Sequence, residues 1–289
     1  MKRFLNLAAF IGSLILSAPL LAQVGQIPGW PPIAVVGCVD TTIHIITATG
    51  TGNATTPAGC GHVLVFARGP GASGATNTGG NGPGGGGGGA YASTSALVVT
   101  PSSTVIYWNN YGGGASVTNT TTAGNDGLGA SWVNVGSNTA PVSSSTGALA
   151  DYGRHGGTTT AGVAGSTANS IGGTLHNGGA GARYTTGGGA AYQSGGGGGG
   201  GDSGDGGTAP GSGGGGGAGG TNGGGAGGGG GNSTTCAVAG TQPGGGGGAA
   251  QNTDACSGKG GDGEVGYQFS AVLDLPPAND NAFSFSEAA

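Results

Sequence analysis

Long runs of glycine are the feature that most limits what this chain can fold into. Six glycines stand in a row at residues 84–89, and residues 195–231 contain 26 glycines among 37 residues. In total 78 of the 289 residues are glycine, against about 7 % in an average protein. Glycine loses more conformational freedom on folding than any other residue. Such runs therefore form either flexible linkers or backbones that are held firmly by their neighbours.

The glycines of residues 195–231 show a threefold bias that favours the second alternative. Stepping by three from Gly195, 11 of 13 positions are glycine, with Pro210 and Asn222 as the exceptions. A left-handed extended helix with three residues per turn would then have one face without side chains. Such bare faces allow helices to pack closely and to pair their N–H and C=O groups with each other. We therefore expect a packed bundle of polyglycine II helices; collagen is excluded, because 13 prolines are too few and strict Gly-X-Y order is absent.

The N-terminus has the pattern of a secretory signal peptide. Lys2 and Arg3 precede the largely apolar residues 4–21, and small residues follow up to Ala22. We expect cleavage after Ala22, so that residues 1–22 are removed; the alternative is an uncleaved anchor, since about 18 residues can just span a bilayer. The mature chain would keep four basic residues against eleven acidic ones. Its net charge of −7 gives no electrostatic surface for nucleic acid.

Four cysteines agree with export to an oxidising compartment. Cys38 and Cys60 are 22 residues apart, and Cys236 and Cys256 are 20 residues apart. Four cysteines allow three connectivities, and proximity in the sequence favours these two local disulfides. A zinc site is the weaker alternative, because no two cysteines are two to four residues apart.

Short β-strands are expected on both sides of the glycine runs. Residues 41–49, 62–67, 131–135 and 264–269 are rich in β-branched and aromatic residues. Residues 96–100 and 104–108 flank a polar turn, which predicts a β-hairpin. No segment after the signal peptide has convincing helical periodicity. The expected fold is thus mostly β, with short antiparallel strands that frame the glycine bundle and are tied by disulfides.

These patterns divide the chain into segments. After the signal peptide, residues 23–37 form a Pro/Gly lead-in, and residues 38–273 form one glycine-rich domain. Within that domain we expect a β framework at 38–135, the glycine bundle at 136–263 and a closing strand at 264–273. Residues 274–289 are expected to be a flexible tail.

At both ends of the domain the sequence resembles the glycine-rich domain of bacterial exported proteins and bacteriophage tail-fibre tips. The strand at 62–67 is followed by the glycines at 84–89 and by LVVTPSSTVIYW at 97–108, and the domain closes with GGDGEVGYQF at 260–269. The resemblance covers about residues 60–270. It implies a β-sandwich-like framework that carries a bundle of polyglycine II helices. In phage adhesins of this architecture, loops between the glycine helices contact the host receptor.

By this resemblance, side chains between the glycine runs are candidates for a contact surface. Asp151, Arg154 and His155 form the tightest polar cluster of the chain. A catalytic interpretation would make His155 a base that Asp151 orients; the simpler interpretation is a polar loop. Aromatic residues such as Trp108 and Trp132 are expected in the core, and Tyr111, beside Gly112, is the expected exception. The candidate contact residues are Tyr111, Tyr152, Arg154, His155, Tyr184 and Tyr192.

Motifs for catalysis or cofactor binding are lacking. Gly-x-Gly-x-x-Gly recurs only because glycine is abundant, and the residues around Lys259 do not form a phosphate-binding loop. Asp202 and Asp205 are more simply solvated loop carboxylates than cation ligands. We therefore expect neither an enzyme nor a cofactor nor a metal.

Four functions remain open at this point. The favoured one is an exported, non-enzymatic surface or extracellular protein with a structural or adhesive role, whose partners are surface glycans, proteins or further copies of itself. Periplasmic location is an alternative, and the membrane is involved only through the signal peptide. A phage-type receptor-binding adhesin fits the resemblance but does not need a signal peptide. Ice binding would use the Thr47-x-Thr49-x-Thr51 array, and a flexible glycine-rich spacer is the fourth possibility.

Overall fold

The computed structural model describes residues 37–78, 82–118, 121–183, 194–211, 214–231, 235–251 and 256–271. The expected signal peptide, nearly all of the lead-in and the tail from residue 272 lie outside these ranges. The described residues belong to the unit Gly37–Ala289.

Regular structure in the described part is almost entirely β. Its one helical element is a 3₁₀ turn at Thr167–Asn169, where the Ser166 hydroxyl accepts a hydrogen bond from the N–H of Ala168. The strands are β1 (Ile43–Ile46), β2 (Gly50–Thr55), β3 (Cys60–Arg68), β4 (Thr76–Asn77), β5 (Tyr91–Val98), β6 (Val105–Asn110), β7 (Ser131–Val135), β8 (Gly147–Ala150), β9 (Thr174–His176), β10 (Ala250–Gln251) and β11 (Glu264–Ala271).

Nine of these strands form two antiparallel sheets. The five-stranded sheet has the order β1-β11-β3-β5-β9, and the four-stranded sheet has the order β2-β6-β7-β8. Strands β4 and β10 form a separate parallel pair. Because β1 and β2 are consecutive but lie in different sheets, the chain crosses from one sheet to the other at residues 47–49.

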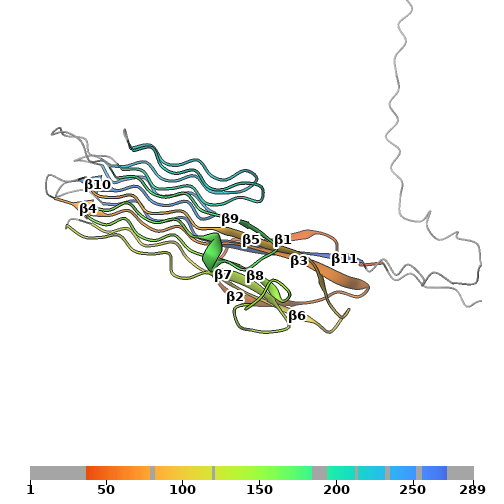
Figure 1. Cartoon of the computed structure of the whole chain (residues 1–289). Coiled ribbons are helices and arrows are strands. Elements are labelled where there is room, and N and C mark those ends of the chain that lie inside the picture. The colour runs from red at the N-terminus through yellow and green to blue at the C-terminus, as the bar shows by residue number, and fades with distance from the viewer. Residues whose placement is uncertain are drawn as a thin grey trace, which may run out of the picture. The chain divides into compact units, whose positions relative to one another are not determined.

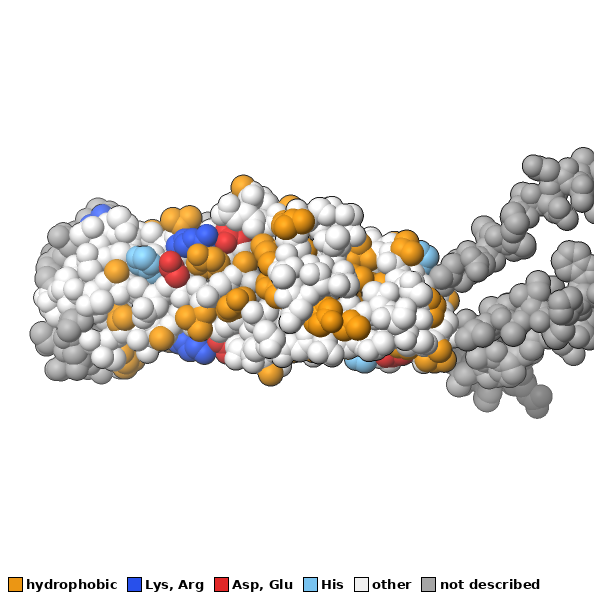
Figure 2. Space-filling view, turned by 90° about the horizontal axis from the view of Figure 1, so that it is seen from below, with side chains coloured by type: hydrophobic (Ala, Val, Ile, Leu, Met, Phe, Trp, Pro, Cys, Tyr) orange, Lys and Arg blue, Asp and Glu red, His pale blue; other side chains and the backbone are white. Residues whose placement is uncertain are grey.

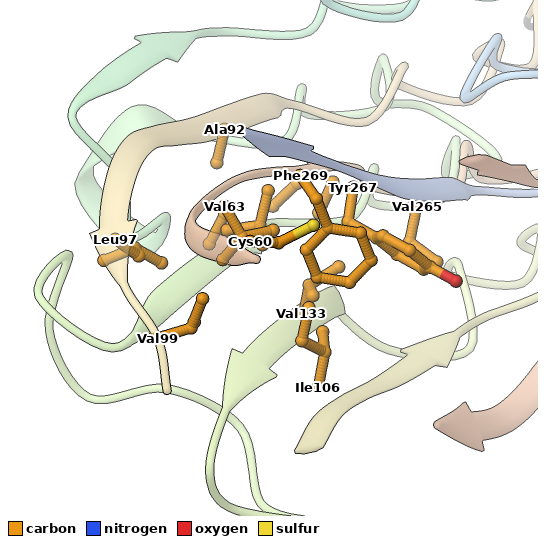
Figure 3. Packing of buried hydrophobic residues seen from close by; sticks show 14 residues of the cluster. Cys60, Val63, Ala92, Leu97, Val99, Ile106, Val133, Val265, Tyr267 and Phe269 are labelled. Atoms are coloured by element: carbon orange, nitrogen blue, oxygen red, sulfur yellow. The ribbon is translucent and has the colours of Figure 1, made fainter. Parts of the chain in front are cut away.

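The hydrophobic core lies between the two sheets. Alternate residues of β3 and β11 point to one face, and Val63, Val65 and Val265 are fully buried there. Figure 3 shows Tyr267 and Phe269 of β11 close to Val133 of β7 and Ile106 of β6. The nine strands of these two sheets therefore form a two-layer β-sandwich. Trp132 and Tyr91 are also buried, as expected for these aromatics.

Sequence patterns predicted three strands well and one connection wrongly. Strands β3, β7 and β11 lie where apolar and β-branched residues indicated them. The hairpin expected around residues 101–103 is not formed, because β5 pairs with β3 and β9 whereas β6 pairs with β2 and β7. The buried Val99 donates its N–H to Gly61 after β5 has ended, and the chain then crosses to the second sheet. The connection is therefore an arch between sheets.

The single strand expected at residues 41–49 is two strands with a turn between them. Strand β1 ends at Ile46, and β2 begins at Gly50, which has a φ of 127°. A backbone conformation of this kind is readily adopted only by glycine. Thr47 and Thr49 lie in the turn, so the three threonines do not form one regular array on a strand.

Glycine-rich segments extend from the sandwich and lie side by side (Figure 1). Their backbone hydrogen bonds run between segments that are far apart in the sequence. The segment at residues 84–90 shows the pattern most clearly, because its consecutive N–H groups donate to three different neighbours in turn. The N–H groups of Gly84, Gly87 and Ala90 donate to the carbonyl groups of residues 157, 154 and 151. Those of Gly85 and Gly88 donate to the carbonyl groups of residues 182 and 179. Those of Gly86 and Gly89 donate to the carbonyl groups of residues 247 and 244.

The carbonyl groups of the same segment reach three further neighbours. Those of Gly85 and Gly88 accept from Gly162 and Gly165, those of Gly86 and Gly89 accept from Gly197 and Gly200, and those of Gly84, Gly87 and Ala90 accept from Ala75, Ala72 and Gly69, all at 2.8–3.0 Å. Six neighbouring segments thus surround residues 84–90, and every third residue returns to the same neighbour. No side chain larger than hydrogen fits at positions 84–89, because a Cβ on any of these glycines would lie within 3.0 Å of a neighbouring carbonyl oxygen.

Both local disulfides favoured by the cysteine spacing are present. Cys38–Cys60 ties the chain before β1 to the start of β3, and Cys236–Cys256 joins two glycine-rich segments. Disulfides are typical of an oxidising compartment such as the periplasm or the extracellular space.

Framework and glycine-rich parts interleave along the chain. Glycine-rich residues 69–75 and 84–90 come before residue 135, whereas β8 and β9 come after it. The expected β framework (38–135) and glycine bundle (136–263) therefore overlap along the chain and do not meet at a single boundary at residue 135. The closing strand begins at Glu264 as expected.

Candidate contact surface

Tyr111 and Tyr152, both partly exposed, lie on either side of one glycine-containing segment. A Cβ on Gly129 would be 3.0 Å from the Tyr111 ring, and one on Gly127 would be 3.0 Å from Cβ of Tyr152. Between these glycines Leu128 is 69 % exposed. The structure therefore places two of the expected contact residues, 41 positions apart in the sequence, against the same short segment, which adds an apolar side chain that was not predicted.

Arg154 covers the ring of Tyr152. Its guanidinium lies 3.6 Å from the ring centroid, and its Nη1 donates to the Tyr152 carbonyl. Its Nη2 donates to Asp151 Oδ1 at 3.1 Å. Asp151 is only 3 % exposed and also accepts hydrogen bonds from the N–H of Ser166 and the side chain of Asn169. A buried carboxylate thus holds the arginine in place over the tyrosine.

His155 is paired with a different carboxylate from the one that the sequence suggested. Its backbone N–H and its Nδ1 lie 2.7 and 2.6 Å from Asp126 Oδ1. Both side chains are exposed by about two fifths. The alternative in which Asp151 orients His155 as a base is therefore wrong, because Asp151 is turned toward Arg154 and the 3₁₀ turn. Tyr184 and Tyr192, the remaining expected contact residues, lie outside the described residues.

Charges on the surface are few and mostly compensated. Lys and Arg side chains lie beside Asp and Glu side chains on the face shown in Figure 2, and much of the rest is uncharged. Among the described pairs are Arg154–Asp151 and Lys259–Asp262, the latter at 2.8 Å. The charges of these two pairs are therefore compensated within the chain.

Asp202 and Asp205, the alternative cation ligands, take part in separate interactions. Asp202 pairs with Arg68, and Asp205 accepts a hydrogen bond from the N–H of Asn177 at 2.8 Å. His176 lies 3.6 Å from Asp205 and stacks on Tyr91. No group of three metal-ligating side chains occurs among the described residues.

A buried ionic cluster joins the sandwich to the glycine-rich part and was not predicted. Arg68 and Glu264 stand opposite each other in the β3–β11 register and form an ion pair. The same guanidinium pairs with Asp202, donates to the carbonyl of Asn222 at 3.3 Å, and lies 5.1 Å from the Phe66 ring. Burial raises the pKa of Glu264 above its usual value, although Arg68 opposes this shift. Burial likewise raises the pKa of the Tyr91 hydroxyl.

Comparisons with protein-family models and with curated proteins give no match. In the described part of the chain, none of the helices is long and apolar enough to cross a membrane.

Proposed function

We propose that this chain is an exported, non-enzymatic surface or extracellular protein with a structural or adhesive role. In this proposal the signal peptide directs export and is cleaved after Ala22. A rigid bundle of polyglycine II helices, rooted in the β-sandwich, presents side chains to surface glycans or proteins. The observation that carries the proposal is the hydrogen bonding of residues 84–90 to six neighbours.

A polyglycine II helix accounts for that pattern. It has three residues per turn and no internal hydrogen bonds, so every N–H and C=O is available to a neighbour. Consecutive groups then point in three directions about 120° apart, and every third group points the same way. Residues 214–220 and 225–231 agree with this period, because residues 214, 217 and 220 are buried in the first segment and 225, 228 and 231 in the second. Their exposed positions carry Gly215, Ala218 and Ala226.

The rigidity of such a bundle would favour binding to a partner. Ordering a segment costs free energy that a binding partner would otherwise have to supply, and a prefolded surface avoids that cost. Tyr111, Leu128, Tyr152 and Arg154 offer flat aromatic, aliphatic and guanidinium surfaces beside the exposed carboxylate of Asp126. These groups can stack on a sugar ring and accept hydrogen bonds from its hydroxyls. We therefore assign this surface to a neutral glycan or a weakly charged protein surface.

Two experiments test this function. Protease treatment of intact producing cells should remove the protein from the cell surface, or the protein should be recovered from the medium; recovery only from a protected periplasm would contradict the adhesive role.

Binding of the purified, oxidised chain to a neutral-glycan array and to intact cells should fall at least tenfold in Tyr152→Ala. Val238→Ala is the matched control, since Val238 is 61 % exposed and its backbone bonds to Gly229 and Gly248 and not to the contact residues. Equal binding by both variants would contradict the assignment of the surface.

A further inference from the structure

Strand β1 leaves one edge of the five-stranded sheet open. In the part of the chain that the structure describes, β1 pairs with β11 and has no strand on its other side. Alternate residues of an edge strand direct their N–H and C=O groups away from the sheet, where another strand can pair with them. Proteins usually protect such edges with lysine, proline or a bulge. The residues Ile43–Ile46 of β1 include none of these protective features.

The open edge also exposes two large apolar side chains. Ile43 is 58 % exposed and Ile45 is 57 % exposed. They point to the outer face of the sheet, beside Gln268 and Gly266 in the β1–β11 register. A strand added at this edge would cover both isoleucines and satisfy the outward backbone groups in one step.

The sequence around β1 fits a second copy of itself. Residues 41–47 read Thr-Thr-Ile-His-Ile-Ile-Thr, which is nearly the same in both directions about His44. Antiparallel pairing centred on His44 places Ile43 of one copy opposite Ile45 of the other, twice, on the same face. We propose that two copies of this chain associate through β1 across a twofold axis at His44, which joins their five-stranded sheets into one.

Charge allows this contact although the mature chain is negative overall. Strand β1 contains no Asp, Glu, Lys or Arg, and the carboxylate of Asp40 is held 2.8 Å from His44 Nε2 of its own copy. His44 also stacks on Tyr267 at 4.7 Å, on the face opposite the isoleucines. Each copy thus brings to the axis an Asp–His pair whose carboxylate is already hydrogen-bonded within its own chain. The contact is small compared with stable interfaces of about 1,200–2,000 Å², so the dimer forms at micromolar concentrations rather than nanomolar ones.

Sedimentation of the oxidised chain from Gln23 over a range of concentrations tests the association. We expect a monomer–dimer equilibrium that Ile45→Lys weakens at least tenfold, because the lysines would crowd the twofold contact. Val163→Lys, at a comparably exposed site in the glycine-rich part, should leave the equilibrium unchanged. The melting temperature of each variant checks that it is folded. A monomer at all concentrations up to millimolar, or equal effects of both lysines, would overturn the proposal.

A cysteine placed at the axis tests the register. The α-carbons of directly opposite residues in an antiparallel pair are about 4.5–5.5 Å apart, within the range of a disulfide. Under mild oxidation His44→Cys should give a covalent dimer, whereas Thr42→Cys, which would face Ile46 of the other copy, should not. A chain ending at Ala271 should dimerise as the longer one does. Loss of the dimer on this truncation, or equal cross-linking of both cysteine variants, would overturn the β1–β1 contact.

Discussion

Replacing Gly88 with alanine is expected to lower the free energy of unfolding by about 3–5 kcal/mol, a very large effect for one methyl group. The added Cβ would lie within 3.0 Å of the Gly198 carbonyl oxygen. The segment cannot shift away from it, because the Gly88 N–H donates to Gly179 and its carbonyl accepts from Gly165. The change therefore either breaks these bonds or separates the segments.

Gly215→Ala provides the matched control in the same kind of segment. Gly215 is exposed, does not have a positive φ, and a Cβ there would meet only Pro210 at 3.4 Å. Alanine also restricts the unfolded chain, so this variant should be neutral or slightly stabilising. Thermal and denaturant unfolding of both variants measures the difference. Similar stabilities for the two would mean that close packing is not what requires glycine at position 88.

Removing the charge of Arg68 is expected to cost about 3–5 kcal/mol at neutral pH. Arg68→Met keeps much of the side-chain volume but leaves Glu264 without its partner in a buried site. The double variant Arg68→Met, Glu264→Gln should recover most of the loss, because no buried charge is left unpaired and the other partner of Arg68, Asp202, is about half exposed to solvent. Lys259→Met is the control for an exposed cation, whose pair with Asp262 should be worth about 1 kcal/mol or less. A loss in the double variant equal to that in Arg68→Met would contradict this explanation.

The pH dependence of the Arg68→Met penalty has a definite sign. The pKa of Glu264 is raised by burial in the folded protein, and Arg68 opposes that rise. A carboxyl with a raised pKa favours folding while it is protonated, and stability falls as pH increases through the folded pKa. Without Arg68 nothing opposes the rise in the pKa of Glu264, so the loss of stability with increasing pH becomes larger. The stability difference between wild type and Arg68→Met should therefore be small near pH 4 and large at pH 7, and a constant difference would exclude Glu264 as the cause.

The sequence predicted those elements that are specified by residues close to each other in the chain. Strands β3 and β11 combine apolar runs with clear boundaries, and both disulfides close short loops. Strands β2 and β8, with the sequences GTGNAT and GALA, were missed because small residues give no apolar alternation. Their position is fixed by β6 and β7, against which they pair.

In the glycine-rich part, too, the sequence predicted a local feature but not the way in which successive segments are arranged. The threefold glycine bias predicted a three-residue period. It did not predict that the buried phase changes from residues 214, 217 and 220 to 225, 228 and 231. The turn between these segments contains Asn222 and Gly223, both with positive φ, and it resets the phase.

Contacts between residues that are far apart in the chain could not be predicted from the sequence. Tyr152, Arg154 and His155 are close in the chain and could be grouped, but Asp126 and Leu128 come to them only through the packing of separate segments. Arg68 and Glu264 are 196 residues apart, and their pairing follows from the β3–β11 register.

Hydrogen–deuterium exchange of the glycine amides tests the central claim, that the glycine runs form an ordered, hydrogen-bonded bundle. The N–H groups of residues 84–90 and 196–201 are buried and bonded to neighbouring carbonyls. We expect their exchange in the oxidised protein to be slowed at least about a thousandfold relative to an unstructured glycine peptide. Exchange at the unprotected rate would contradict the bundle and show that the runs are flexible linkers.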